Sequence, residues 1–87
     1  MKIDFDPIKN AKNIADRGLD FARAAEVFVG VLATREDTRQ NYGETRLISI
    51  GNLQGRAVVL VWTLRGAVRR IISMRYAHES ETRKYAP

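Results

Sequence analysis

The stretch from residue 45 to residue 75 constrains the fold of this chain more than any other feature. It holds three apolar segments, Thr45–Gly51, Arg56–Arg65 and Val68–Arg75. Two very short connections, Asn52–Gly55 and Gly66-Ala67, join them. Parallel strands need a crossover of a dozen or more residues, whereas antiparallel strands can be joined by two. The stretch therefore predicts an antiparallel three-stranded meander. A chain of 87 residues supports one core, so we expect a single domain over residues 1–87.

The residues before the meander predict a strand and a helix. Lys2–Phe5 alternates between polar and apolar residues, as a half-buried strand does. Asp6-Pro7 is typical of a helix start, and Gly18 is typical of a helix end. The apolar stripe that we expect to face the sheet consists of Ile8, Ala11, Ile14 and Ala15.

A second helix is expected directly after the first. Asp20 provides its N-cap, Gly30 ends it, and its apolar stripe consists of Phe21, Ala24, Ala25 and Phe28. Val31–Ala33 is then a candidate brief strand, Thr34–Gly43 predicts an exposed loop, and Tyr76–Tyr85 predicts a short final helix. The expected architecture is α+β. It has an N-terminal strand and two helices packed on one face of an antiparallel three- to four-stranded sheet, and a short C-terminal helix.

The positive charge of the chain is concentrated in one block. Residues 38–78 contain seven arginines, no lysine and a single carboxylate, Glu44, in a chain whose net charge is +5. A guanidinium binds phosphate through two parallel hydrogen bonds, whereas a lysine ammonium acts as a point charge. The block favours a polyanion partner, and nucleic acid in particular, over the alternative in which the arginines only decorate solvated strand positions.

Composition argues against several other classes of protein. The chain has no cysteine and one histidine, His78, so we expect no disulfide, metal site or cofactor. The first ten residues lack the apolar stretch of a signal peptide, and the longest apolar run, Ala57–Trp62, is too short to span a bilayer. We therefore expect a cytoplasmic protein with no membrane partner.

Pairing the strands through the two turns brings a polar cluster together. A tight hairpin at Gly66-Ala67 places Thr63 opposite Arg70, and a four-residue loop at Asn52–Gly55 places Glu44 opposite Thr63. One end of this face would then carry Glu44, Arg46, Thr63, Arg65 and Arg70. Its middle would carry Ile48, Val59, Val61, Ile72 and Met74. A single bulge would turn a strand over and dissolve the arrangement, and because the other face is also apolar, alternation does not decide which face the helices cover.

A second group of polar residues is expected at the opposite end of the last strand. Arg75 lies there in the sequence register, near Arg56 and beside His78, with Tyr76 and Tyr85 close in the sequence. His78 is interpreted either as a capping or surface residue or as part of an Arg–His–Tyr neighbourhood that protonates a leaving oxygen.

Three stretches together resemble the BrnT toxins. "FDPIKNAKNIADRGLDFARAAEVF" is similar to the opening of that family, with Asp16 and Arg17 in place of a customary Lys-His pair and Arg23 in place of an acid. "YGETRLISIG" is similar to the pattern Y-G-E-x-R-x-x-x-x-G, and "RRIISMRYAHESETRKY" to R-I-I-S-A-R-x-A-x-x-x-E-x-x-x-Y. The resemblance covers nearly the whole chain, with the three motifs in the family's order.

The resemblance implies a ribonuclease toxin of a type II toxin–antitoxin pair, with a fold like that of the RelE and ParE toxins. It also implies a BrnA-type antitoxin that neutralises the toxin by direct binding, and operator DNA that is bound only through the antitoxin complex. The polar residues that match the motifs are Glu44, Arg46, Arg70 and Arg75.

Metal-independent RNA cleavage turns the 2′-hydroxyl on the adjacent phosphate, which needs a base, an acid and cations. Glu44 is the first candidate for the base, and the alternative is a plain ion pair between Glu44 and Arg46. The candidate cations are Arg46, Arg65, Arg70 and Arg75, and the candidate acid is His78 or a tyrosine. The further candidate RNA-binding residues are Arg56, Arg69, Arg83 and Tyr85. A non-catalytic nucleic-acid- or protein-binding module of the same fold is the competing interpretation.

Overall fold

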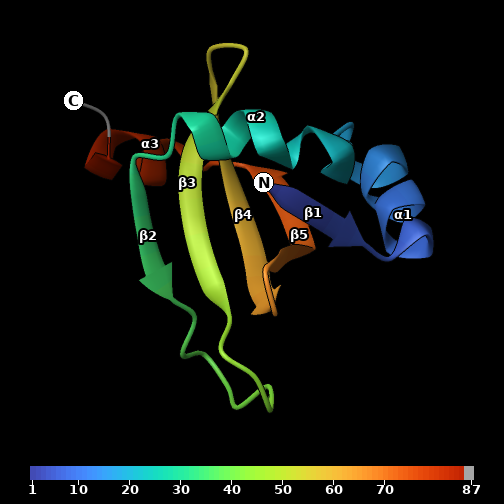
Figure 1. The fold of residues 1–87 in the computed structure, drawn as a ribbon. Coiled ribbons are helices and arrows are strands. Elements are labelled where there is room, and N and C mark those ends of the chain that lie inside the picture. The colour runs from blue at the N-terminus through green and yellow to red at the C-terminus, as the bar shows by residue number, and fades with distance from the viewer. Residues whose placement is uncertain (86–87) are drawn as a thin grey trace.

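The computed structural model describes residues 1–85 and shows an α+β protein (Figure 1). Within these residues the strands are β1 (Lys2–Phe5), β2 (Ala33–Glu36), β3 (Leu47–Leu53), β4 (Arg56–Arg65) and β5 (Val68–Tyr76). The helices are α1 (Pro7–Arg17), α2 (Ala24–Val29) and α3 (Glu79–Tyr85), and a 3-10 turn over Phe21–Arg23 directly precedes α2.

The five strands form one mixed sheet in the order β1-β5-β4-β3-β2. The meander of β3, β4 and β5 is confirmed, but the predicted sheet of three to four antiparallel strands is wrong in two respects. β1 pairs with β5 in parallel, because the helical segment between them provides the crossover that a parallel pair requires. β2 pairs with β3 through residues that the polar composition had assigned to an exposed loop, Thr34 to Glu36.

The two hairpins agree only partly with the predicted register. The turn at Gly66-Ala67 is tight, with Arg65 opposite Val68 and a φ of 62° at Gly66. The predicted four-residue loop between β3 and β4 is wrong, because Gln54 and Gly55 alone make the turn with φ values of 49° and 80°. Positive φ at both central residues is the conformation of a two-residue hairpin turn. The resulting shift of two residues preserves the face of every β3 side chain.

A bulge in β5 changes the second half of that strand. Trp62 pairs with Ile71, but the next residue of β4, Val61, pairs with Ser73, so Ile72 has no partner on β4. The extra residue turns the remainder of β5 over. Met74 therefore faces Leu60, contrary to the prediction that it shares a face with Val59.

The sheet separates two faces of different character. We call the first the core face, because α2 and the preceding 3-10 turn cover it and form the apolar core with Val58, Leu60, Trp62, Ile71 and Met74. Gly51 brings α2 closest to this face, since a Cβ there would lie 2.6 Å from the Val27 carbonyl oxygen. We call the second face the arginine face; it carries Arg46, Arg65, Arg70 and Arg75 beside Val59 and Val61.

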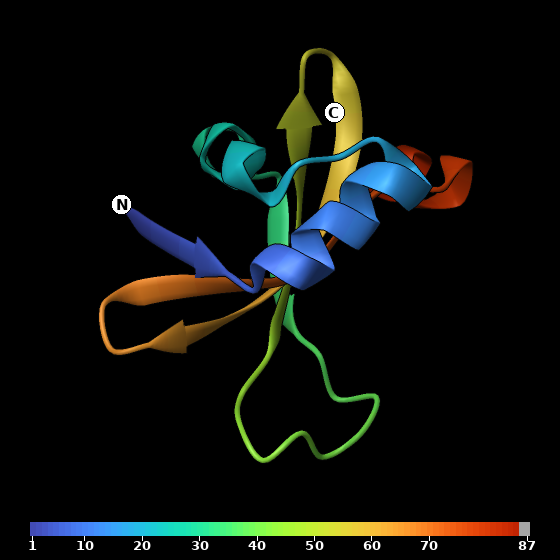
Figure 2. The same ribbon diagram turned by 90° about the vertical axis from the view of Figure 1, so that its right-hand side faces the viewer.

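The helices lie on both sides of the sheet, not on one side as predicted (Figure 2). α3 covers one end of the arginine face, where Glu81 contacts Arg75 and a groove of about 310 Å³ separates the helix from the sheet. Side chains from β2, β3, β4 and α3 line this groove, including Arg35, Ile48, Ile50, Val59, Glu81 and Lys84.

α1 packs against the sheet with its polar side, which contradicts the predicted apolar stripe. Ile8 is 81% exposed, whereas Asn10 and Asn13 are buried. The Asn13 amide donates to the main-chain oxygens of Leu19 and Met74 at 2.9 and 3.0 Å. β1 pairs only with the first half of β5, so donors from α1 take the place of a neighbouring strand beyond that point.

The start of the second helical segment is confirmed in part. Asp20 accepts from the Ala22 amide as an N-cap, and Asn10 holds the same carboxylate with its amide nitrogen at 2.9 Å. The first turn is a 3-10 turn, however, and regular α-helix begins at Ala24. No helix within residues 1–85 is long and apolar enough to cross a membrane.

Candidate functional site

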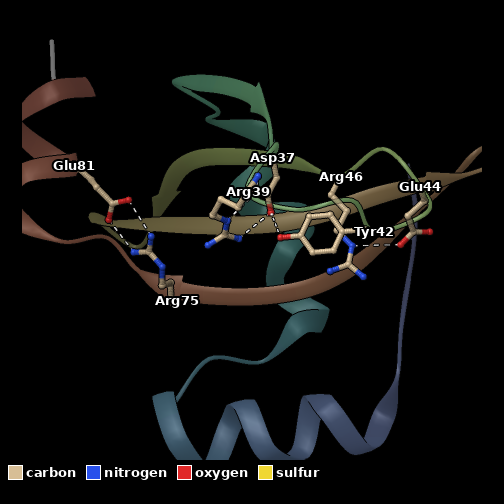
Figure 3. A network of polar contacts seen from close by, with 7 residues as sticks. All are labelled: Asp37, Arg39, Tyr42, Glu44, Arg46, Arg75 and Glu81. Carbon is tan, nitrogen blue, oxygen red and sulfur yellow. Dashed lines mark hydrogen bonds and ion pairs between the residues drawn. The ribbon is translucent and has the colours of Figure 1, made fainter.

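The arginine face receives its cations from three adjacent strands. Arg46 precedes β3, Arg65 ends β4, and Arg70 and Arg75 lie on β5. The β5 bulge is what brings the last two to the same face. Rigid strands hold the four guanidinium groups in place, and three carboxylates form ion pairs with them, so the face combines cations with bases (Figure 3 shows two of the four arginines).

Glu44 lies between two arginines from different strands. Its Oε2 is 3.4 Å from Arg46 Nε, and its Oε1 is 3.6 Å from Arg65 Nη2. The Glu44 side chain is 28% exposed, so a ligand can reach it. The ion pair with Arg46 that was the simpler interpretation is present, and it leaves room for a chemical role because both contacts are long.

Arg70 occupies the same end of the arginine face. It lies opposite Thr63, and its Nη1 is 3.3 Å from Asp4 Oδ2 on β1. Thr63 is buried and its hydroxyl donates to the Thr45 main-chain oxygen at 2.7 Å. The predicted cluster of Glu44, Arg46, Thr63, Arg65 and Arg70 is therefore assembled on one face, although two of its ion pairs involve Glu44 and the third involves a carboxylate that the sequence did not indicate.

Arg75 is held at the other end of the face by α3. Its guanidinium donates to both Glu81 oxygens, at 2.8 and 2.9 Å (Figure 3). This bidentate contact lowers the pKa of Glu81 to about 2. The His78 amide donates to the same carboxylate, and the His78 carbonyl accepts the first bond of α3 from Thr82, so the main chain of His78 caps the helix as the simpler interpretation expected.

The two ends of the arginine face are too far apart to act on one phosphate. Leu47 lies opposite Trp62, so Arg46 comes beside Thr63, whereas Arg75 lies opposite Val59. The two positions are four residues apart along β4, which corresponds to roughly 13 Å. Figure 3 shows Glu44 and Glu81 at opposite ends of the group. The structure therefore separates His78 from Glu44, which the sequence had proposed as an acid and base pair.

Two of the other candidate RNA-binding residues, Arg56 and Arg69, do not lie on the arginine face. Arg56 and Arg69 belong to the core side, where the Arg56 guanidinium stacks on Tyr76 at 3.5 Å and that of Arg69 on Phe28 at 4.5 Å. The expectation that Arg56 lies beside Arg75 is wrong, because the bulge sends them to opposite faces. Arg83 is exposed on α3, and the side chain of Tyr85 lies outside the part of the chain that the structure describes.

The sequence did not indicate the group centred on Asp37. Asp37 follows β2, and its side chain is fully buried, although it is charged. It accepts two bonds from the Arg39 guanidinium at 2.8 Å each and a third from the Tyr42 hydroxyl at 3.1 Å (Figure 3). These bonds, with that of Arg39 first, hold the pKa of Asp37 well below its usual range. The one available signal was the Asp37–Arg39 spacing, typical of an Asx-turn.

The architecture and the arginine face define a small, basic α+β domain that displays guanidinium groups and carboxylates from rigid strands. A family model described as the ribonuclease toxin BrnT of type II toxin–antitoxin systems matches residues 5–81. The chain belongs to this family, as the three sequence motifs indicated. A search among curated proteins finds no match. Membership implies an RNA target and an antitoxin partner.

Proposed function

We propose that this protein is a metal-independent endoribonuclease toxin, and that it cuts RNA at the Glu44 end of the arginine face. Family membership supports ribonuclease activity. The observation that carries the site is the position of Glu44 between Arg46 and Arg65, with Arg70 at the same end. A carboxylate among guanidinium groups supplies a base beside the cations that a pentavalent phosphate requires.

In the proposed reaction, the RNA 2′-oxygen attacks the adjacent phosphorus and the P–O5′ bond breaks. Glu44 takes the 2′-hydroxyl proton, the leaving 5′-oxygen acquires a proton from solvent or from a nearby acid, and a 2′,3′-cyclic phosphate remains. Arg46, Arg65 and Arg70 stabilise the charge that develops at phosphorus. The separation of His78 from Glu44 argues for assigning His78 to RNA binding or to helix capping in this scheme.

Arg75 has a different role in this proposal. It lies roughly 13 Å from the Glu44 end, so it would bind a neighbouring phosphate of the same strand and orient the RNA along the face. The Arg75 guanidinium already donates to both Glu81 oxygens. To bind a phosphate, Arg75 must therefore either contact Glu81 and the phosphate at the same time or give up its bonds to Glu81. Arg83 on α3 would extend this path.

The remaining features follow from the family and stay predictions. They are a fold of the RelE/ParE type, a cytoplasmic location, a BrnA-type antitoxin, and operator DNA bound only through the antitoxin complex. We expect the antitoxin to cover the arginine face with acidic or apolar segments. A complex in which the partner contacts only α1 and α2 and leaves the arginine face open would contradict this expectation.

One experiment tests the proposed function directly. The purified protein is incubated with single-stranded RNA in the presence of EDTA, and the products are analysed for chain length and for cyclic phosphate ends. Fragments with 2′,3′-cyclic ends are expected, and Glu44→Gln should abolish most of the cleavage while leaving RNA binding intact. Binding without cleavage by the unaltered protein would instead indicate the non-catalytic module.

A further inference from the structure

The segment from Asp37 to Arg46 connects β2 to β3 and projects beyond the end of the sheet (Figures 1 and 2), but several of its side chains contact one another on the arginine face. The Asp37 amide donates to the Arg46 carbonyl at 2.8 Å, so these residues lie opposite each other and their side chains share a face. Asp37 then binds Arg39 and Tyr42, and the Arg46 guanidinium stacks on the Tyr42 ring at 4.0 Å. The contacts form one chain from Arg39 through Asp37 and Tyr42 to Arg46.

This network holds its charged groups at unequal depths. The side chain of Asp37 is 0% exposed, whereas that of its partner Arg39 is 67% exposed. Removing a carboxylate from water is costly, and a buried ion pair is seldom the best way to stabilise a fold. What the arrangement does achieve is to fix an exposed guanidinium in one orientation, with the negative charge hidden beneath it.

The position of Arg39 matches the path proposed for RNA. In Figure 3 its guanidinium lies between those of Arg75 and Arg46, which mark the two ends of the arginine face. A cation between them is where a strand bound at both ends would present an intervening phosphate. The two Asp37 bonds use Nε and Nη2 of Arg39, so Nη1 remains available for a phosphate oxygen.

We propose that Arg39 is an RNA phosphate-binding residue, and that Asp37 is a positioning residue that holds Arg39 directly and Arg46 through Tyr42. This inference rests on the proposed function. It adds Arg39 to the RNA-binding surface, with Asp37 and Tyr42 as its supporting residues, from a segment that composition alone describes as a polar loop.

Binding is measured by fluorescence anisotropy with a labelled single-stranded RNA whose 2′-hydroxyls are methylated, so that cleavage cannot remove the ligand. Arg39→Ala should weaken binding about tenfold or more, the effect of losing a charged hydrogen bond, and should reduce the slope of log affinity against log salt by about one. Arg23→Ala is the matched control. Arg23 also forms a two-bond ion pair, with Glu26, but it lies in the 3-10 turn before α2, on the core side of the sheet. Its loss changes the net charge equally.

Asp37→Asn separates positioning from simple charge. This change removes a negative charge from a basic surface, so electrostatics alone would strengthen RNA binding. Positioning predicts the opposite: Asp37→Asn weakens binding by several-fold, and adding it to Arg39→Ala causes no further loss. Affinity equal to or tighter than that of the parent would overturn the assignment of Asp37. If Asp37→Asn fails to fold, Tyr42→Phe tests the same contact network, because it removes only the hydroxyl bond to Asp37. The expected result is a loss of cleavage with little loss of binding.

The outcomes distinguish this inference from the proposed function. If the unaltered protein neither binds nor cleaves RNA, the proposed function fails and the inference fails with it. If the unaltered protein cleaves RNA and Arg39→Ala binds and cleaves equally well, only the inference fails. Loss of antitoxin binding by Arg39→Ala with RNA binding unchanged would assign the segment to the antitoxin and overturn the proposal.

Discussion

The two faces of the sheet use the same amino acid in different ways. On the core face, arginines lie on aromatic rings: Arg56 on Tyr76, and Arg69 on both Phe28 and Trp62. On the arginine face, each arginine is paired with a carboxylate, namely Arg46 and Arg65 with Glu44, Arg70 with Asp4, and Arg75 with Glu81. Stacking uses the flat surface and the apolar stem of arginine, whereas ion pairing uses its donors.

This difference teaches that a count of arginines overestimates the functional surface. Adjacent residues of one strand, Arg69 and Arg70, contribute to different properties of the molecule, because alternation sends one to the core and the other to the arginine face. Substitutions on the core face should change the stability of the fold, and substitutions on the arginine face should change RNA binding and cleavage. The following predictions test that division, in order of decreasing effect.

The largest effect is expected at the Glu44 end of the arginine face. Arg46→Ala should lower RNA turnover by about 10² to 10³, or about 2.7–4 kcal/mol, because a preorganised donor to a developing oxyanion is lost. Single-turnover cleavage assays measure this change, and thermal unfolding checks that the fold is intact. Arg46→Lys should restore little, since an ammonium cannot reproduce the guanidinium fork. Cleavage at the parental rate by Arg46→Ala would place the catalytic centre elsewhere, with Arg75 the next residue to examine.

A purely structural loss is expected on the core face at Gly51. Gly51→Ala should lower the free energy of unfolding by about 1–3 kcal/mol, the usual cost of overpacking, because its Cβ would meet the Val27 carbonyl oxygen. Urea denaturation gives the value. Gly30→Ala is the control, because no atom lies within 4 Å of the added Cβ and the φ of Gly30 is −113°, which other residues adopt without strain. Equal stability of Gly51→Ala and the parent would show that α2 does not approach β3 this closely.

Acid should expose the contribution of Glu81 to stability. Since its pKa is lowered from 4.5 to about 2, folding favours the ionised form. The stabilisation is therefore complete above about pH 4.5 and is lost as the pH falls toward 2. Because Glu81 and Arg75 are 27% and 33% exposed, solvent screening reduces the effect to on the order of 1 kcal/mol. Glu81→Gln should show a smaller loss of stability between pH 5 and pH 3 than the parent; identical pH profiles would contradict the ion pair.

The smallest effect is expected at Arg69 on β5, whose neighbour Arg70 lies on the opposite face of the sheet. Arg69→Ala should cost about 0.5–1 kcal/mol of stability, the value of an exposed cation–π contact, with RNA cleavage unchanged. Its neighbour Arg70→Ala should instead weaken RNA cleavage, and any stability change should be small because its pair with Asp4 is at the surface. If both variants weaken cleavage equally, the division between the faces does not hold.

The sequence predicted the elements whose signals are local. The Asp6 and Asp20 caps, the Gly18 helix end and the Gly66-Ala67 hairpin all depend on a few adjacent residues, and all are confirmed. The β3–β4 turn was misread because Asn52-Leu53-Gln54-Gly55 allows both a four-residue loop and a two-residue turn. The orientation of α1 was misread because β1 does not extend to Met74, whose main-chain oxygen accepts a hydrogen bond from Asn13 instead, so an amide and not an isoleucine faces this edge. This orientation depends on where β1 ends along β5, and the sequence of the helix alone does not determine that.

The candidate site was predictable to the extent that it depends on parity within strands. Glu44, Arg46, Arg65 and Arg70 shared a face in the assumed register, and the error of two residues in β3 left that result unchanged. Asp37 could not be found in this way. Its carboxylate is buried and binds Arg39 and Tyr42 of the same loop, whereas a carboxylate in a polar stretch is ordinarily solvated.

The single extra residue in β5 has a consequence for reading related sequences. Arg70 and Arg75 are five positions apart, an odd interval that would place them on opposite sides of a regular strand. Ile72 absorbs one position, so the interval behaves as an even one. A chain that lacks this residue would keep its two arginines at an interval of four and would display them on the same side from a flatter strand. An interval of four residues in a regular strand and an interval of five in a bulged strand therefore place the two arginines on the same face. A motif search that fixes the interval at one of these values would miss sequences that use the other.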